Sequence, residues 1–290
     1  MSRHTTFKTG GNAAYYAIPA DRGEAAELIR YLYINKIKHF VIGNGSNLLV
    51  SDSGYDGVII DLGRHDGTEF TQLGVEEKDG EVIFDAGAGC LLSSIGNYAV
   101  QFEAAGFEAL SGIPGCIGGA CIMNAGAYGS EMKDVLVSVD IITREGFEAK
   151  LPAEKLGLGY RHSALMDDGS IVTRAEIRLK KGRAEDIRAL SESYMEKRRD
   201  KQPLNYPSAG STFKRPEGYF AGKLIEDAGL RGYSVGGAQV SEKHCGFIIN
   251  RDGASSADIY RLIREVQRIV FEKHGVMLEP EVRLLGSFDA

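Results

Sequence analysis

Two glycine-rich stretches are the parts of the sequence whose residue types and spacing most directly suggest chemistry. The first is Gly43-Asn44-Gly45-Ser46-Asn47, which leads into Leu48. The second runs from 111 to 129, and its residues of interest are Gly112, Pro114, Gly115, Gly118, Gly119, Ala120, Asn124, Gly126 and Ala127. Glycine allows the backbone to approach a ligand closely, and consecutive backbone N–H groups can cradle a pyrophosphate. Two such stretches in one chain predict a site for a large, diphosphate-containing cofactor.

Both stretches also have a purely structural interpretation. Asn and Gly are favoured in hairpin turns, and a glycine-rich crossover can simply require positive φ angles. The first stretch is not a GxGxxG fingerprint, because Leu48 occupies the third glycine position and a strand is expected to follow. The loops alone therefore leave a ligand site and a set of turns both open.

The charge balance restricts the possible partners. The chain of 290 residues has 34 Lys and Arg against 40 Asp and Glu, a net charge of -6. This balance gives no global attraction to nucleic acid or to an anionic membrane, so a phosphate site must be local. The basic cluster from Lys197 to Lys201 is a candidate, although a solvated helix end is the ordinary interpretation.

The cysteines and the apolar runs exclude several other classes. Cys90, Cys116, Cys121 and Cys245 have no CxxC spacing and the histidines are scattered, so we expect neither a metal site nor a disulfide framework. No apolar run approaches the ~20 residues of a membrane helix, and the first residues lack a signal-peptide pattern. We therefore expect a soluble, cytoplasmic protein with no membrane insertion.

Hydrophobic periodicity predicts an α+β fold. Apolar residues with helical spacing, including Ala25, Ile29 and Leu32 after a capping pair Asp21 and Glu24, predict a helix over 22–35. Further helices are expected over 91–102, 184–200 and 256–274. Short β-branched or aromatic runs predict strands over 15–18, 38–42, 48–51, 57–62, 82–86, 135–143, 147–151, 171–180 and 281–285. The glycine-rich passage 110–130 has no clear periodicity.

Seven segments, in order along almost the whole chain, resemble one enzyme family. They are HTTFKTGGNA (4–13), GNGSNLLVSD (43–52), SGIPGCIGGACIMNAGAYGSEMKD (111–134), YRHSAL (160–165), the lysine of RRDKQP (198–203), SAGSTFKRP (208–216) and LEPEVRLLG (278–286). The family is that of the UDP-N-acetylenolpyruvoylglucosamine reductases, flavoenzymes with the vanillyl-alcohol-oxidase type of FAD-binding fold. The chain resembles the shorter subclass without an inserted tyrosine loop, because little sequence separates Arg161 from Ser211.

The resemblance implies a fold and a cofactor. It implies a two-part FAD-binding region and a C-terminal α/β substrate-binding domain. The expected boundaries are 1–62 completed by 275–290 for the first FAD-binding part, 63–200 for the second, and 201–274 for the substrate domain. FAD is expected to be bound non-covalently, with the loop 43–48 and the passage 112–127 as its contacts.

The resemblance also implies a reaction in the synthesis of peptidoglycan precursors. NADPH reduces FAD, and UDP-N-acetylglucosamine enolpyruvate then receives the hydride and becomes UDP-N-acetylmuramate. Arg161 matches the family residue that stabilises the enolate, Ser211 matches the proton donor, and Glu281 matches the glutamate beside the carboxylate. Glu279 lies two residues away, so an exchange of roles with Glu281 stays open.

For the UDP diphosphate, Lys201 is the strongest match, with Tyr160 and Arg215 as further candidates. We also expect a monomer. One alternative keeps the flavin fold but gives an oxidase of a small alcohol, with FAD attached through Cys116 or Cys121. A second alternative is a regulatory nucleotide-binding module, although such a sensor needs no proton donor like Ser211.

Overall fold

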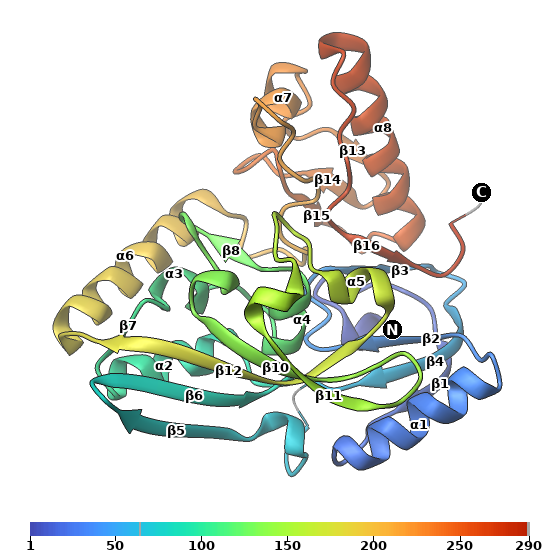
Figure 1. Ribbon diagram of the computed structural model, residues 1–290. Coiled ribbons are helices and arrows are strands. Elements are labelled where there is room, and N and C mark those ends of the chain that lie inside the picture. Colours follow the sequence, from blue (N-terminus) through green and yellow to red (C-terminus); the bar gives the residue numbers. More distant parts are fainter. Residues whose placement is uncertain (64, 289–290) are drawn as a thin grey trace. The chain divides into compact units, whose positions relative to one another are not determined.

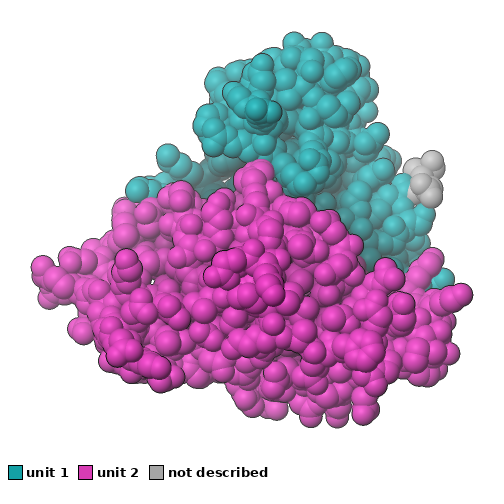
Figure 2. All heavy atoms as spheres, in the orientation of Figure 1, with its two compact units in different colours: residues 1–14, 45–56, 197–290 teal, residues 15–44, 57–196 magenta. Residues whose placement is uncertain are grey.

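The computed structural model describes residues 1–63 and 65–288, and the chain divides into two compact units (Figure 2). Unit 1 comprises residues 1–14, 45–56 and 197–290, and unit 2 comprises residues 15–44 and 57–196. One of the four points at which the chain passes between the units falls inside the first glycine-rich loop, between Asn44 and Gly45. The expected three-part division remains a proposal.

Unit 2 is built around a six-stranded sheet with the order β11-β10-β12-β6-β5, with β7 paired to β12 (Figure 1). Its strands are β5 (Leu73–Lys78), β6 (Glu81–Gly87), β7 (Ala104–Ala105), β10 (Leu136–Ile142), β11 (Glu148–Pro152) and β12 (Ile171–Lys181). Alternate residues of β6, such as Val82 and Phe84, are buried, as expected for a strand with one face in the core. They pack in one cluster with Leu92 and Ile95 of helix α2 (Leu92–Gln101).

A smaller sheet in unit 2 has the order β1-β4-β2 and packs against helix α1 (Arg22–Ile34). Its strands are β1 (Ala13–Ala17), β2 (His39–Ile42) and β4 (Tyr55–Asp61). The Asp21 side chain accepts from the Glu24 N–H at 2.9 Å, whereas the Glu24 carboxylate takes the Ala20 N–H. The expected capping box is therefore only partly regular. Asp21 accepts from the Glu24 N–H as expected, but the Glu24 carboxylate accepts from the N–H of Ala20 instead of that of Asp21. Because β2 and β4 are parallel, their carboxyl ends lie at the same edge of the sheet.

The other elements that begin in unit 2 are short, except for one helix. They are the 3₁₀ helices η2 (Glu69–Thr71), η3 (Met132–Asp134) and η4 (Ala153–Leu156), the helices α3 (Glu108–Ser111), α4 (Ile117–Ile122), α5 (Ala164–Asp168) and α6 (Ala184–Lys201), and the strands β8 (Gly126–Ala127) and β9 (Ser130–Glu131).

Unit 1 combines helix α8 (Ser256–His274) with the antiparallel sheet β13-β14-β15. Apolar residues of α8, such as Ile259 and Val266, share a core with Ala238 and Ile248 of that sheet. A capping box starts α8, and Gly275 ends it with a left-handed φ of 68°. The other elements are η1 (Ser2–His4), α7 (Ala221–Asp227), β13 (Ser234–Val235), β14 (Ala238–Val240), β15 (Ile248–Asn250) and the parallel pair β3 (Leu48–Val50) and β16 (Arg283–Leu285).

The α+β class and the four long predicted helices are confirmed. One strand of the large sheet and several short helices and strands were not predicted. Sequence analysis missed β5 and the short pieces α3, α4, α5, α7 and β13 to β15. Such runs are too short to show a period, so tertiary contacts decide their structure. The expected strand 281–285 was also too long. It begins at Arg283, because the Glu281 N–H donates to the Thr212 carbonyl at 2.8 Å instead of joining β3.

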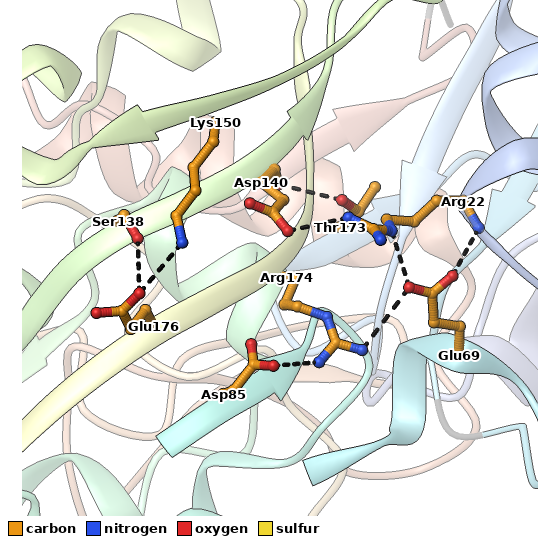
Figure 3. Close-up of polar contacts among 9 residues, drawn as sticks. All are labelled: Arg22, Glu69, Asp85, Ser138, Asp140, Lys150, Thr173, Arg174 and Glu176. Atoms are coloured by element: carbon orange, nitrogen blue, oxygen red, sulfur yellow. Dashed lines mark hydrogen bonds and ion pairs between the residues drawn. The ribbon is translucent and has the colours of Figure 1, made fainter. Parts of the chain in front are cut away.

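An ion-pair network connects helix α1 and η2 to the six-stranded sheet of unit 2 (Figure 3). Glu69 lies 2.8 Å from Arg22 Nε and 3.7 Å from Arg174 Nη2. Arg22 also pairs with Asp140 of β10 at 3.0 Å, and Arg174 pairs with Asp85 of β6 at 2.6 Å. A carboxylate shared by two guanidinium groups at half-buried positions is expensive to remove, because both cations lose a partner.

We therefore expect Glu69→Gln to lower the free energy of unfolding by about 1–3 kcal/mol, measured by denaturant titration. The matched control is Glu185→Gln, which removes an ion pair with Arg183 between two largely exposed side chains. That control should change the stability by less than about 0.5 kcal/mol. Equal effects of the two substitutions would contradict a structural role for the network.

Candidate active site

The two glycine-rich stretches meet within unit 2. The Asn44 side chain donates to the Pro114 carbonyl at 2.8 Å. A Cβ atom at Gly43 would lie only 3.1 Å from Cys116 Cβ, so a larger residue would press against the second stretch. Residues of the two stretches are thus adjacent, and a shared ligand stays a prediction.

A buried carboxylate, which sequence analysis missed, lies next to the region where the two stretches meet. Asp61, the last residue of β4, accepts hydrogen bonds from the Tyr16 hydroxyl and the Gly63 N–H, and it lies 2.9 Å from His65 Nε2. Burial, and then the hydrogen bond to Asp61, raises the pKa of Tyr16, so the phenol remains a donor. A Cβ at Gly63 would lie 3.0 Å from the Gly43 carbonyl. The available signal was a charged residue at the end of a buried strand.

The second stretch contains helix α4, whose glycines differ in environment. A Cβ at Gly118 would lie 2.9 Å from Ala88 Cβ, so that glycine allows close packing, and Ala120 is buried beside it. Around Gly119, in contrast, no described atom outside its chain neighbours and the backbone of its own helix lies within 4 Å of a Cβ position. Glycine inside a helix costs about 0.5–1 kcal/mol relative to alanine, and no described neighbour requires it here. The residues present therefore fit a group that approaches α4 at Gly119.

Two other glycines of this stretch have structural roles. Gly112 ends helix α3, and the Gly115 carbonyl accepts from the Leu92 N–H at 3.1 Å. Gly115 thus holds the stretch against helix α2, and Gly112 closes helix α3. A contact of either residue with a cofactor stays a prediction.

The amide nitrogen and the amide oxygen of the Asn124 side chain both have hydrogen-bond partners within the protein. Its amide donates to Glu131 and to the Gly159 carbonyl, each at 2.9 Å, and its oxygen accepts from the Lys133 N–H at 2.9 Å. The residue is fully buried and has a left-handed φ of 42°. Asn124 therefore shapes the loop that carries Gly126 and Ala127, and a contact with a cofactor would have to come from its backbone.

Arg161 lies at the third position of a tight turn. Gly159 and His162 pair through two backbone hydrogen bonds, and Tyr160 and Arg161 form the turn between them. Arg161 has φ +54°, a conformation typical of glycine or asparagine at this position. Strain of this kind is stored where function requires it, and it costs about 1–3 kcal/mol per residue.

The Arg161 guanidinium is oriented by contacts on both sides. Its Nη2 donates to the Gly126 carbonyl at 3.2 Å, and its Cζ lies 4.9 Å from the centre of the Tyr160 ring. A hydrogen bond from Lys133, with smaller effects of Asn124 and of the Arg161 charge, lowers the pKa of the Glu131 carboxyl. The cation is thus positioned next to the end of the glycine-rich stretch.

Ser211 lies in unit 1, on a segment that hydrogen bonds to residues 246–248 hold in place. The next residue, Thr212, donates its N–H to the Gly246 carbonyl at 2.8 Å, and its hydroxyl accepts from the Ile248 N–H at 3.0 Å. Ser211 itself is exposed, and the described residues offer its hydroxyl no hydrogen-bond partner. A fixed backbone therefore presents an available hydroxyl.

Glu281 and Glu279 lie on the segment next to Ser211, and the structure distinguishes them. The Glu281 N–H donates to the Thr212 carbonyl at 2.8 Å. Glu279 lies one step further along, and its carboxylate pairs with Lys214 at 2.5 Å. Glu279 is thus held by Lys214 and Glu281 by the Thr212 backbone, and the choice of Glu281 as the carboxyl that acts with Ser211 stays a prediction. Arg161 belongs to unit 2, and its convergence with these two residues stays a prediction.

The other end of the first loop belongs to unit 1. Gly45 has φ +60°, and a Cβ there would lie 2.0 Å from the His4 carbonyl, so only glycine fits. Asn47 donates from its side chain to the Glu281 carbonyl at 3.1 Å. Leu48 starts β3 with a buried side chain, and Ser46 is half-buried. For Leu48, only the backbone is available to a cofactor.

The residues expected to bind the diphosphate lie in both units. Lys201 is the last residue of α6. Burial, with smaller effects of the Arg231 and Lys201 charges, lowers the pKa of His244 in the same unit. Arg215 lies with its guanidinium 4.0 Å from the centre of the Phe220 ring. Tyr160 is exposed in the turn of unit 2. Their roles stay predictions.

Among residues 1–63 and 65–288, no group of histidine, cysteine and carboxylate side chains could hold a metal ion, and the four cysteines are free and buried. Complete burial raises the pKa of the Cys121 thiol to about 12, which disfavours the thiolate needed for attachment to a flavin. No helix among these residues is long and apolar enough to cross a membrane.

Comparisons with known proteins show which proteins this chain is similar to. A model described as the C-terminal domain of UDP-N-acetylenolpyruvoylglucosamine reductase matches residues 202–285, and an FAD-binding domain model matches residues 13–150. A UDP-N-acetylenolpyruvoylglucosamine reductase from Agathobacter rectalis is 48% identical, covering 99% of this chain and 93% of the relative. Another from Caldanaerobacter subterraneus is 50% identical, with 99% and 92% covered.

A solved structure shows the same arrangement of elements. The crystal structure of UDP-N-acetylenolpyruvylglucosamine reductase from Thermus caldophilus matches with a TM-score of 0.81 and 35% identity. The match covers 98% of this chain and 97% of that one. The similarity is thus not confined to either the FAD-binding part or the C-terminal part.

Proposed function

The chain belongs to the UDP-N-acetylenolpyruvoylglucosamine reductase family, and we propose that it reduces UDP-N-acetylglucosamine enolpyruvate to UDP-N-acetylmuramate, with NADPH as hydride donor and FAD as cofactor. This reaction supplies a precursor of peptidoglycan. The structural observation that carries the proposal is the hydrogen bond from Glu281 to Thr212, because it joins a carboxyl-bearing segment to the segment of a serine with an available hydroxyl.

FAD, when bound, supplies the chemistry of accepting a hydride from NADPH and passing it to the methylene carbon of the enolpyruvyl group. Asn44 and Gly43 support its site by holding the two glycine-rich stretches together, and Gly119 leaves room for close approach to α4. Backbone N–H groups in such loops suit a pyrophosphate, which needs donors but no fixed cation.

Arg161 provides the positive charge that the substrate requires. Hydride addition to an α,β-unsaturated carboxylate generates an enolate, whose charge must meet donors already oriented toward it. A guanidinium can bind both oxygens of such a carboxylate with parallel hydrogen bonds. The contact with Gly126 and the strained turn hold the Arg161 side chain in a limited set of positions.

Ser211 supplies the proton that completes the reaction at carbon. A serine hydroxyl is a weak acid, so its contribution depends on placement and on the high basicity of the enolate. The two hydrogen bonds of Thr212 to the 246–248 segment fix the backbone next to Ser211. Glu281 acts beside the same carboxylate, where a protonated carboxyl or a pair with Arg161 avoids repulsion between like charges.

Lys201 is our choice for the UDP diphosphate, with Arg215 and Tyr160 as additional contacts. The proposal also includes the division into two FAD-binding parts and a substrate domain, with the boundaries given above. We further propose a cytoplasmic location and a monomeric state. Sedimentation of the purified chain at several concentrations tests the last point, because a stable dimer would contradict it.

Non-covalent FAD gives a simple expected result. Acid precipitation of the purified yellow protein should leave the flavin in the supernatant, because buried Cys121 has too high a pKa to attach it and Cys116 is also buried. The measurement is flavin absorbance in the supernatant and the pellet. Colour that stays with the pellet would support a covalently flavinylated oxidase instead.

The reaction itself is tested with purified components. Without oxygen, NADPH beyond one equivalent per flavin should be consumed only when UDP-N-acetylglucosamine enolpyruvate is added, and mass spectrometry should find a product heavier by two hydrogens. A small alcohol should not reduce the flavin. Reduction by the alcohol, with no change in the UDP-sugar, would replace the proposed function with the oxidase alternative.

A further inference from the structure

The last residue of the first glycine-rich loop is tied to the segment that carries Glu281. The Asn47 side chain donates to the Glu281 carbonyl at 3.1 Å, and the Asn47 carbonyl accepts from the Arg283 N–H at 3.0 Å. All three residues belong to unit 1. Asn47 is thus hydrogen-bonded to both Glu281 and Arg283.

Glu281 is consequently fixed on both sides of its backbone. Its N–H donates to the Thr212 carbonyl, beside Ser211, and its carbonyl accepts from Asn47. Since both peptide groups of Glu281 have partners, the direction in which its side chain leaves the backbone is restricted.

We propose that Asn47 is a positioning residue for the reaction, which holds Glu281 in place relative to Ser211, and that its side chain does not bind the cofactor. The inference rests on the proposed function, since it assigns Asn47 a role through Glu281. It revises the expectation from the sequence that every residue of the loop 43–48 contacts FAD. The loop thereby joins the cofactor site to the carboxyl that acts on the substrate.

The two asparagines of this loop have different tasks. Asn44 donates to the Pro114 carbonyl in unit 2 and therefore stabilises the meeting of the glycine-rich stretches. Asn47 donates to the Glu281 carbonyl in unit 1. Asn44→Ala and Asn47→Ala thus form a matched pair, with the same side chain removed from the same loop and different expected defects.

The first experiment separates the two half-reactions by stopped-flow absorbance under anaerobic conditions. Asn47→Ala should keep the full content of FAD and reduce it with NADPH at the wild-type rate. Oxidation of the reduced flavin by the enolpyruvyl substrate should slow about 10- to 100-fold, because small displacements of a reacting group have effects of this size. Asn44→Ala should instead lower the FAD content.

A double-mutant cycle shows whether Asn47 acts through Glu281. In a Glu281→Ala background, adding Asn47→Ala should leave the rate of flavin oxidation within about twofold, because the residue to be positioned is gone. Effects that multiply would overturn the inference. Loss of FAD, a slower NADPH step, or unchanged oxidation in Asn47→Ala would overturn it as well.

Asn47→Asp provides a second variant that retains the size of the side chain. It removes the donor to the Glu281 carbonyl and adds a negative charge, so it should behave like Asn47→Ala and keep FAD. If Asn47 lay against the cofactor diphosphate, the new charge would strongly weaken FAD binding, and that result would contradict the inference.

A measurement independent of activity tests the contact itself. Hydrogen exchange of the peptide 278–285 should become faster in Asn47→Ala than in the wild type, since the Glu281 and Arg283 amides lie in the held segment. Unchanged exchange would refute the tether. If the wild type failed to reduce the UDP-sugar, the proposed function would fall, whereas the exchange result would still decide whether Asn47 holds Glu281.

Discussion

Ser211→Ala should leave the reduction of FAD by NADPH intact and slow its oxidation by the enolpyruvyl substrate by about 10²- to 10⁴-fold, the usual contribution of a general acid. The hydroxyl is exposed on a fixed segment and has no partner among the described residues, so its removal should not disturb the fold. Rapid-mixing absorbance of the flavin measures both steps separately.

Ser208→Ala is the matched control, because Ser208 lies in the same SAGSTF segment and pairs through its backbone with Ile249. It should keep both half-reactions within about twofold of the wild type. Normal turnover of Ser211→Ala would remove this serine from the mechanism. Equal defects in the two variants would indicate damage to the segment and not loss of a proton donor.

Arg161→Lys should lower the rate of substrate reduction by about 10²- to 10³-fold, as is typical when an oriented donor to a developing negative charge is lost. An ammonium cannot reproduce two parallel hydrogen bonds to a carboxylate, although it keeps the charge. Steady-state kinetics with NADPH and the UDP-sugar measure the effect. Wild-type activity of this variant would contradict the role of Arg161 at the enolate.

Arg161→Gly separates catalysis from stability. Glycine relieves the φ of +54°, worth about 1–3 kcal/mol, and loses the hydrogen bond to Gly126, worth about 1 kcal/mol. The free energy of unfolding should therefore stay equal or rise, while substrate reduction is lost. A variant that is both inactive and strongly destabilised would show that Arg161 mainly supports the fold.

The parts of the fold that follow local rules were predictable from the sequence. Helix α8 begins and ends where its long apolar period and Gly275 predict, and a capping box at Ser255, which was not predicted, agrees with that start. Strands with β-branched runs, such as β10 and β12, were also found within a few residues. Short elements such as α4 and β13 depend on their neighbours, and no pattern in one sequence contains that information.

The candidate site was predictable as a set of residue types but not as a set of contacts. The glycine-rich loops indicated a diphosphate ligand, and the resemblance supplied Arg161, Ser211 and Glu281 as candidates. Long-range hydrogen bonds then changed the interpretation of single residues. Asn124 is used by its own loop, and Asn47 holds Glu281. Asp61 was missed, because its partners Tyr16 and His65 meet it only in the folded chain.

The central claim is that reduced flavin in this protein passes its hydride to an enolpyruvyl group on a UDP-sugar. Its most direct test is the absorbance of the anaerobic wild-type protein, first with one equivalent of NADPH and then with UDP-N-acetylglucosamine enolpyruvate. We expect the yellow colour to fade with NADPH and to return when the UDP-sugar is added. A flavin that stays bleached with this substrate, while oxygen still restores its colour, would contradict the claim.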